Sequence, residues 1–177
     1  MRTKIVATLL AAGVLMAGAG CKRRDRVRIQ QIEEEGPQLA TAIHVADPRA
    51  SAQLVSGFYD VEQNAWRWTA GKFAVILRPP RGAAQKGAVL RLKFSVPEAV
   101  IDKLKAVSLG ASIDGTALSP ETFTQSGEFT YQRDVPGALL ARDTAKVDFS
   151  LDKSLPPGAG DQRELGVIVT SVGFEAK

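Results

Sequence analysis

Two carboxylates within residues 57–77 have the residue type and spacing of groups that do acid–base chemistry. This stretch reads GFYDVEQNAWRWTAGKFAVIL, and in an extended backbone Asp60 and Glu62 point to the same side. Hydrolysis of a glycosidic bond uses two carboxyl groups that flank the bond from different sides. Residues two apart on one strand lie roughly 6.5–7 Å apart at Cα. The pair therefore fits surface solvation or calcium binding as well as hydrolysis, and a hydrolase is an alternative hypothesis only.

Trp66 and Trp68, the two tryptophans of the chain, form the second candidate site. An extended backbone places both indoles on one face of a strand and Arg67 on the other. Exposed indoles are a platform for sugar rings, because a flat aromatic surface packs against the apolar C–H face of a pyranose. Burial is the commoner fate of tryptophan, so we expect at least one of the two to pack on the core. Arg67 has three candidate partners for a surface ion pair: Asp60, Glu62 and Glu164.

His44 is the only histidine in the sequence, and Cys21 is the only cysteine. A Ser-His-Asp arrangement would have to use His44, and no glycine-elbow motif accompanies it. The sequence contains no P-loop, dinucleotide fingerprint, paired-cysteine motif or zincin helix. We expect His44 to be an exposed or edge-strand residue rather than a metal ligand. The sequence thus predicts no catalytic residue, no metal and no cofactor.

The basic character of the chain is concentrated in a short N-terminal segment. The formal charge of +4 is compatible with a nucleic-acid partner. Residues 22–28, KRRDRVR, hold five basic groups and one aspartate, and beyond them 16 basic and 18 acidic groups remain. A nucleic-acid-binding domain carries its positive patch on the folded surface. The charge distribution therefore argues against a nucleic-acid partner.

The first twenty residues predict export. A positively charged start precedes an apolar run over residues 5–17 and small residues before Cys21. This run is shorter than the roughly 20 residues that a transmembrane helix needs. We therefore expect residues 1–20 to form the helix of a signal peptide, and residues 21–42 to form a charged linker that starts with Cys21.

Ala19, Gly20 and Cys21 resemble the end of the lipobox of bacterial lipoproteins, and Gly18 stands where that motif usually has Leu. The resemblance implies cleavage before Cys21, diacylglyceryl attachment to its sulfur and acylation of the new amino group. Several acyl chains make membrane attachment stable where one would be marginal. The basic residues 22–28 would then lie at the lipid headgroups.

The residue after the lipidated cysteine bears on localisation. In lipoproteins of bacteria with two membranes, an Asp at this position tends to retain the protein at the inner membrane. Lys22 occupies it here. The resemblance therefore implies a cell-envelope protein, anchored by lipid at the outer membrane and facing the periplasm.

Alternating apolar segments separated by turns predict an all-β domain over residues 43–177. Residues 89–96 alternate cleanly, as a half-buried strand does, whereas residues 72–78 are apolar on both faces, which predicts a central strand. Asp114 and Gly115 between two alternating segments are typical of a type I′ hairpin turn.

One short helix interrupts this pattern. It is expected to begin at Pro97, with Val100, Ile101 and Leu104 on its buried face. Short strands with a single helical interruption are typical of a sandwich or barrel. The fold class expected is an antiparallel β-sandwich of the jelly-roll or Greek-key type.

Two separated motifs resemble small bacterial β-sandwich modules of the jelly-roll, carbohydrate-binding-like type. The first is GFYD at residues 57–60 with WRWTAGK at residues 66–72, and the second is DQRELG at residues 161–166. The resemblance covers residues 43–175, and such modules occur on envelope proteins and beside glycosyltransferases. It implies that the first and last strands lie together, which would bring Arg163 and Glu164 near the tryptophans, as an Arg–Glu contribution to the edge of the core.

The sequence therefore predicts a membrane-anchored envelope lipoprotein with one non-catalytic β-sandwich that acts as a binding or structural module. Its expected partners are the lipid bilayer, through acylated Cys21, and either an envelope glycan or another envelope protein. The first alternative is a glycan-binding module that uses both tryptophans. The residues of that candidate ligand site are Trp66, Trp68, Arg67, Asp60 and Glu62.

Overall fold

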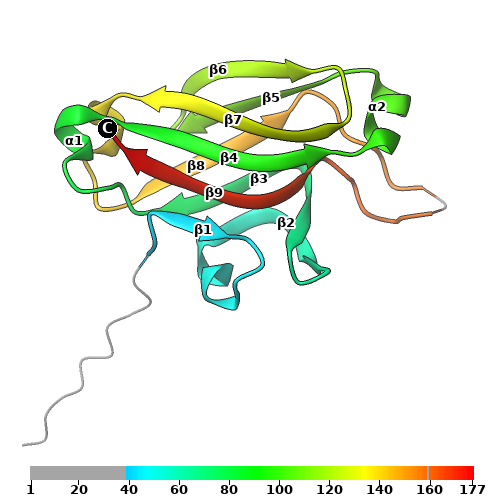
Figure 1. Cartoon of the computed structure of the whole chain (residues 1–177), viewed down its shortest axis with the longest axis horizontal. Coiled ribbons are helices and arrows are strands. Elements are labelled where there is room, and N and C mark those ends of the chain that lie inside the picture. The colour runs from blue at the N-terminus through cyan, green and yellow to red at the C-terminus, as the bar shows by residue number, and fades with distance from the viewer. Residues whose placement is uncertain (1–38, 159) are drawn as a thin grey trace, which may run out of the picture. The chain divides into compact units, whose positions relative to one another are not determined.

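The computed structural model describes residues 39–158 and 160–177 of the chain, and Figure 1 shows their arrangement. The strands are β1 (Ala42–His44), β2 (Leu54–Glu62), β3 (Trp66–Leu77), β4 (Ala88–Val96), β5 (Val107–Ile113), β6 (Thr116–Phe123), β7 (Gly127–Val135), β8 (Ala145–Leu151) and β9 (Ile168–Ala176). In the described residues they form one antiparallel sheet in the order β6-β5-β8-β3-β9-β4-β7, with β1 paired to β9 and β2 paired to β3. The predicted signal peptide, Cys21 and residues 22–38 lie outside the described part.

Four short helical segments connect the strands that the structure describes. They are the α-helices α1 (Ala83–Lys86) and α2 (Glu98–Leu104) and the 3₁₀ helices η1 (Pro48–Gln53) and η2 (Gly137–Leu140). The predicted helix is α2, which begins after Pro97 and buries Val100 completely. The other three are single or double turns of four to six residues, too short for a helical period to show in the sequence. Within the described residues, none of these helices has the length and apolarity to span a bilayer.

Strand β3 is the central strand of the sheet, as its two apolar faces predicted. One edge of β3 has two partner strands. Arg67 and Trp68 pair with β9, and the segment from Lys72 to Leu77 pairs with β8. Its other edge pairs with β2. Phe73, Ala74 and Val75 are all buried. The sheet divides into two layers along β3, because β9 pairs with its first residues and β8 pairs with its later residues.

The two layers enclose a hydrophobic core. Phe94 of β4 meets Phe123 of β6 edge to face, with ring centroids 5.1 Å apart, although these strands lie far apart in the order of the sheet. Phe73 of β3 stacks on Phe149 of β8 at 4.9 Å. Burying each such ring stabilises the fold by about 1.5–3 kcal/mol. These contacts confirm the predicted antiparallel β-sandwich.

Side chains join the two ends of the strand order, β6 and β7. The Tyr131 hydroxyl donates to the carbonyl of Ser119 at 2.8 Å, and Arg133 Nε donates to the same carbonyl at 2.6 Å. Arg133 also pairs with Glu121 at 3.0 Å. Burial raises the pKa of Tyr131 above its usual value. The sandwich is thus closed along this side by polar side chains.

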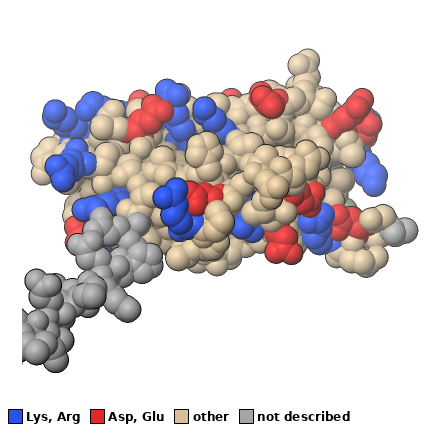
Figure 2. Space-filling model, turned by 60° about the horizontal axis from the view of Figure 1, so that its bottom comes forward, with Lys and Arg blue, Asp and Glu red and all other residues tan. Residues whose placement is uncertain are grey.

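Two smaller predictions are also confirmed. Asp114 and Gly115 have φ angles of 47° and 83°, as a type I′ turn between β5 and β6 requires. His44 is exposed on the three-residue strand β1, which pairs with β9. On the face turned forward in Figure 2, basic and acidic side chains are intermingled.

Candidate functional site

The candidate site lies on the hairpin formed by β2 and β3. Its turn is made by Gln63 and Asn64, whose φ angles are 52° and 55°, and the Ala65 N–H donates to the Glu62 carbonyl at 3.1 Å. Two successive positive φ angles define a type I′ turn, whose twist matches that of the flanking strands. Gln63 and Asn64 therefore form the turn that sets the register of the hairpin.

The register of β2 against β3 brings carboxylates and aromatic rings to one side of the hairpin. Glu62 lies directly opposite Trp66, and a bulge then places both Tyr59 and Asp60 opposite Trp68. Directly opposed residues of an antiparallel pair project to the same side of the sheet. This surface is termed the hairpin face, and it consists of Tyr59, Asp60, Glu62, Trp66 and Trp68.

The two indoles of the hairpin face differ in their surroundings. Trp68 is half-buried and packs against the hydrophobic core, which accords with the expectation that at least one tryptophan would do so. Trp66, at the start of β3, is also half-buried and keeps part of its surface in solvent. Tyr59 is half-buried and Asp60 is exposed. The face therefore offers partly accessible aromatic surface beside the exposed carboxylate of Asp60.

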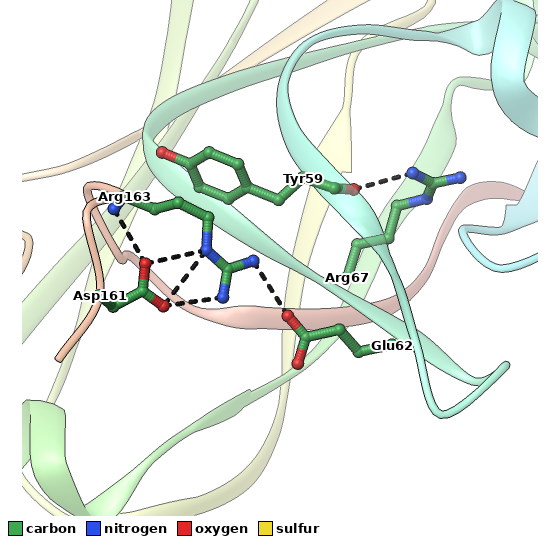
Figure 3. A network of polar contacts seen from close by, with 5 residues as sticks. All are labelled: Tyr59, Glu62, Arg67, Asp161 and Arg163. Carbon is green, nitrogen blue, oxygen red and sulfur yellow. Dashed lines mark hydrogen bonds and ion pairs between the residues drawn. The ribbon is translucent and has the colours of Figure 1, made fainter.

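Arg163 ties this face to the loop before β9 (Figure 3). Its Nε and Nη2 donate to the two oxygens of Asp161 at 3.0 and 2.8 Å, and its Nη1 donates to Glu62 at 2.9 Å. The guanidinium carbon lies 5.1 Å from the centre of the Tyr59 ring, within the range of a cation–π contact. One cation therefore holds two carboxylates and an aromatic ring.

These contacts shift the protonation equilibria of the ion pair. The side-chain hydrogen bond from Arg163, followed by the bond from its backbone N–H, holds the pKa of Asp161 below its usual range. The bonds to Asp161 and then Glu62 raise the pKa of Arg163 above its usual range. Both shifts favour the charged forms of the ion pair.

The loop that carries Arg163 is closed at its base. The backbone N–H of Leu155 donates to the Leu165 carbonyl at 2.8 Å, and the reverse bond is 2.9 Å long. Glu164 accepts a hydrogen bond from the hydroxyl of Ser154 inside the same loop. The resemblance had implied that Arg163 and Glu164 would lie near the tryptophan stretch. Arg163 reaches that hairpin by its ion pair with Glu62, and the Glu164 carboxylate lies beside Gly71 of β3 while it accepts from Ser154.

Arg67 does not form the expected ion pair. Its Nε donates to the carbonyl of Val45 at 2.7 Å, and its Nη1 donates to the carbonyl of Tyr59 at 2.8 Å. The prediction of Asp60, Glu62 or Glu164 as its partner is therefore wrong. The reason is geometric, since Arg67 leaves β3 on the side opposite the hairpin face, where backbone carbonyls are the available acceptors. Figure 3 shows Arg67 approaching the Tyr59 carbonyl from the side away from Arg163.

The predicted carboxylate pair is divided between two roles. Glu62 is engaged by Arg163 at 2.9 Å, whereas Asp60 forms no ion pair with any residue in the described ranges. A glycosidase of the usual kind needs two carboxyl groups that both reach the scissile bond. The hairpin therefore offers one carboxylate without an ion pair, and the hydrolase hypothesis gains no support from this geometry.

The described residues contain no cluster of three or more His, Cys, Asp or Glu side chains with the geometry of a metal site.

Tyr59 and Asp161 were not among the candidate residues predicted from the sequence. The signal for Asp161 is local, because an Asp two residues before an Arg can accept from that residue's backbone N–H, as here at 2.9 Å. No pattern in the sequence indicates the contact of Tyr59 with Arg163.

No protein-family model and no curated protein matches this chain. Among solved structures, a family 35 carbohydrate-binding module from an environmental isolate aligns over 81% of this chain and 90% of its own, with 12% identity and a TM-score of 0.38. The structure of CBM51-2 in complex with GlcNAc and INT domains from Clostridium perfringens ZmpB aligns over 77% of this chain and 28% of its own, with 11% identity and a TM-score of 0.37. A CBM4 structure shows 14% identity and a TM-score of 0.31. Likeness at this level does not establish shared function.

Proposed function

We propose that this protein is a non-catalytic glycan-binding β-sandwich, anchored in the bacterial envelope by acylation of Cys21. In this proposal the anchor lies in the outer membrane and the domain faces the periplasm. The anchor rests on the lipobox-like end of the export signal and on Lys22 after it. The binding function rests on the hairpin face.

The observation that carries the binding function is the placement of aromatic and polar groups on one hairpin. Trp66 keeps part of its indole accessible, and an indole can stack on the C–H face of a pyranose ring. Asp60 is exposed on the same side and can accept hydrogen bonds from sugar hydroxyl groups. Stacking and directed hydrogen bonds together are the chemistry of a sugar site.

Arg163 makes this surface ready to bind. A bidentate ion pair with Asp161 and a second one with Glu62 hold the guanidinium in place before any ligand arrives. Groups that are already ordered lose less conformational freedom on binding, which raises affinity. The ion pairs on this face are half-exposed, and their contribution is to geometry more than to stability.

The test is tryptophan fluorescence of the soluble Cys21→Ser chain, titrated with hexasaccharides of β-1,4-linked N-acetylglucosamine, glucose and xylose. A stacking ligand is expected to shift or quench indole emission for at least one of these sugars. Trp66→Ala should weaken the binding of that sugar by about tenfold or more, because the stacking surface is lost. Val55→Ser is the matched control, since Val55 is 49% exposed on β2 and lies away from the turn.

Two results would contradict the proposal. One is the absence of any emission change across the three hexasaccharides. The other is a Trp66→Ala chain that binds as tightly as the Val55→Ser control.

A further inference from the structure

A row of cross-strand neighbours extends the hairpin face across the second layer of the sheet. Trp68 lies opposite Ile168 of β9, Ile168 lies opposite Ser95 of β4, and Ser95 lies opposite Glu128 of β7. Each opposed pair projects to the same side, so all four side chains share one face of the sheet, half-buried at Trp68, Ile168 and Ser95 and exposed at Glu128. With strands about 4.8 Å apart, the row is roughly 14 Å long.

The far end of this row contains a surface hollow. Its volume is about 360 Å³, and its polar lining includes Lys93, Ser95, Glu128, Thr130 and Thr170. Ser95 and Glu128 belong to both the row and the hollow. The hollow therefore adjoins the row of residues that starts at Trp68.

A bulge in β9 shapes the hollow. The register of β4 against β9 shifts between Lys93 and Phe94, where Ser171 and Val169 are the partners, so Thr170 is the extra residue. The Thr170 hydroxyl donates to the Lys93 carbonyl at 3.2 Å. The bulge thus holds the Thr170 hydroxyl against the backbone of Lys93, in the lining of the hollow.

The chemistry of the lining suits a polyhydroxylated ligand. Lys93 supplies an ammonium donor, Glu128 a carboxylate acceptor, and the hydroxyls of Ser95 and Thr130 can both donate and accept. Lys93, Glu128 and Thr130 are exposed, so their hydrogen-bonding groups are accessible from solvent. Between the hollow and Trp68, the half-buried Ile168 offers an apolar contact.

We infer that the ligand is an extended glycan chain, which stacks one ring on the hairpin face and passes over Ile168 into the hollow. There, Lys93, Ser95 and Thr130 bind the hydroxyl groups of a later ring. This inference rests on the proposed function and adds that the site has several sugar-binding positions. A single sugar or a disaccharide would fill the hairpin face alone.

The test compares disaccharides and hexasaccharides of the same three β-1,4-linked series by calorimetric titration of the Cys21→Ser chain. The hexasaccharide is expected to bind at least about tenfold more tightly than its disaccharide. A Lys93→Ala, Thr130→Ala double variant should remove this gain and leave the disaccharide affinity unchanged. A Lys146→Ala, Thr122→Ala double variant is the control, because these residues have the same types and are exposed on β8 and β6.

The outcomes separate this inference from the proposed function. If the disaccharide binds and depends on Trp66 but the hexasaccharide binds no more tightly, the extended site is wrong and the glycan-binding function stands. A gain that survives in the Lys93→Ala, Thr130→Ala variant also overturns the extended site. If none of the six saccharides binds the wild-type chain, the proposed function fails and this inference fails with it.

Discussion

Arg163 is the side chain that determines the geometry of the candidate site. Its guanidinium contacts Asp161, Glu62 and the ring of Tyr59, and these residues belong to two segments far apart in the chain. A single exposed ion pair contributes about 0–1 kcal/mol to stability. The bidentate geometry and the second carboxylate fix the orientation of the guanidinium. The principal effect of Arg163 is therefore to position the hairpin against the loop.

The Asp161–Arg163 contact should depend on pH. The pKa of Asp161 is lowered, so its favourable contribution is complete above the ordinary aspartate pKa of about 3.9 and is lost as the pH falls through the lowered value. The Arg163 Nε–H resonance in ¹H–¹⁵N NMR spectra should be constant from pH 7 to about pH 5 and should change only below about pH 4. In the Asp161→Asn chain this resonance should already be displaced at pH 7.

A resonance that shifts between pH 5 and pH 7 would contradict this reading of the contact. A spectrum at pH 7 that is identical in the Asp161→Asn chain would also contradict it, since the carboxylate would then have no effect on Arg163.

Arg67 has a different role from the one its sequence context suggested. It joins the end of β1 to β2 by donating to the carbonyls of Val45 and Tyr59. Hydrogen bonds from a charged donor contribute about 1.5–3 kcal/mol each. Tyr59 contacts Arg163 through its ring and Arg67 through its carbonyl. It is therefore held on both sides of the hairpin.

Strand β2 owes its irregular course to its glycine. Gly57 has a φ of 74°, and a Cβ at this position would collide with the carbonyl of Lys72 on β3. The register of β2 against β3 shifts three times: between Leu54 and Ser56, across Gly57 between Ser56 and Phe58, and between Phe58 and Val61. The last of these shifts is the bulge that places Tyr59 and Asp60 opposite Trp68.

Gly57→Ala should therefore destabilise the fold by more than the cost of the left-handed backbone conformation alone. Gly82 is the matched control, because its φ is 77° and an added Cβ meets no atom within 4 Å. Gly82→Ala should destabilise by about 1–2 kcal/mol, the cost of the left-handed backbone. Gly57→Ala should lose about 1–3 kcal/mol more, since the backbone of β3 must move. Urea unfolding of the two variants measures the difference, and equal midpoints would refute the close approach of β2 and β3.

At the scale of the whole molecule, the domain is expected to be one part of a lipid-anchored protein. Cys21 and the basic residues 22–28 precede the described sandwich, and each Lys or Arg near an anionic surface contributes about 1 kcal/mol. The acyl chains would provide the stable attachment, and the basic segment would add to it.

Two substitutions in the full-length chain test the anchor. Cys21→Ser should release the chain from membranes, and Lys22→Asp should keep it lipidated but move it from the outer to the inner membrane fraction. Mass spectrometry of the wild-type chain should show cleavage before Cys21 and three acyl chains on that residue. An unmodified thiol with the chain in the soluble fraction would refute the anchor. An unchanged distribution of the Lys22→Asp chain would refute the assignment to the outer membrane.

The sequence by itself determined the local features of this protein. The alternation in residues 89–96 predicted β4, two apolar faces predicted the central position of β3, and Asp114-Gly115 predicted the hairpin of β5 and β6. Each of these depends on a backbone period or a turn conformation that a few consecutive residues specify.

Only the tertiary structure decided which distant residues meet. Glu62 and Arg163 are 101 positions apart, and their contact requires β9 to pair with the first residues of β3. The bulge at Tyr59 and Asp60, the acceptors of Arg67 and the row from Trp68 to Glu128 likewise follow from strand register. Register and strand neighbours are set by the packing of the whole core, because a slip of one residue would turn every buried side chain outward.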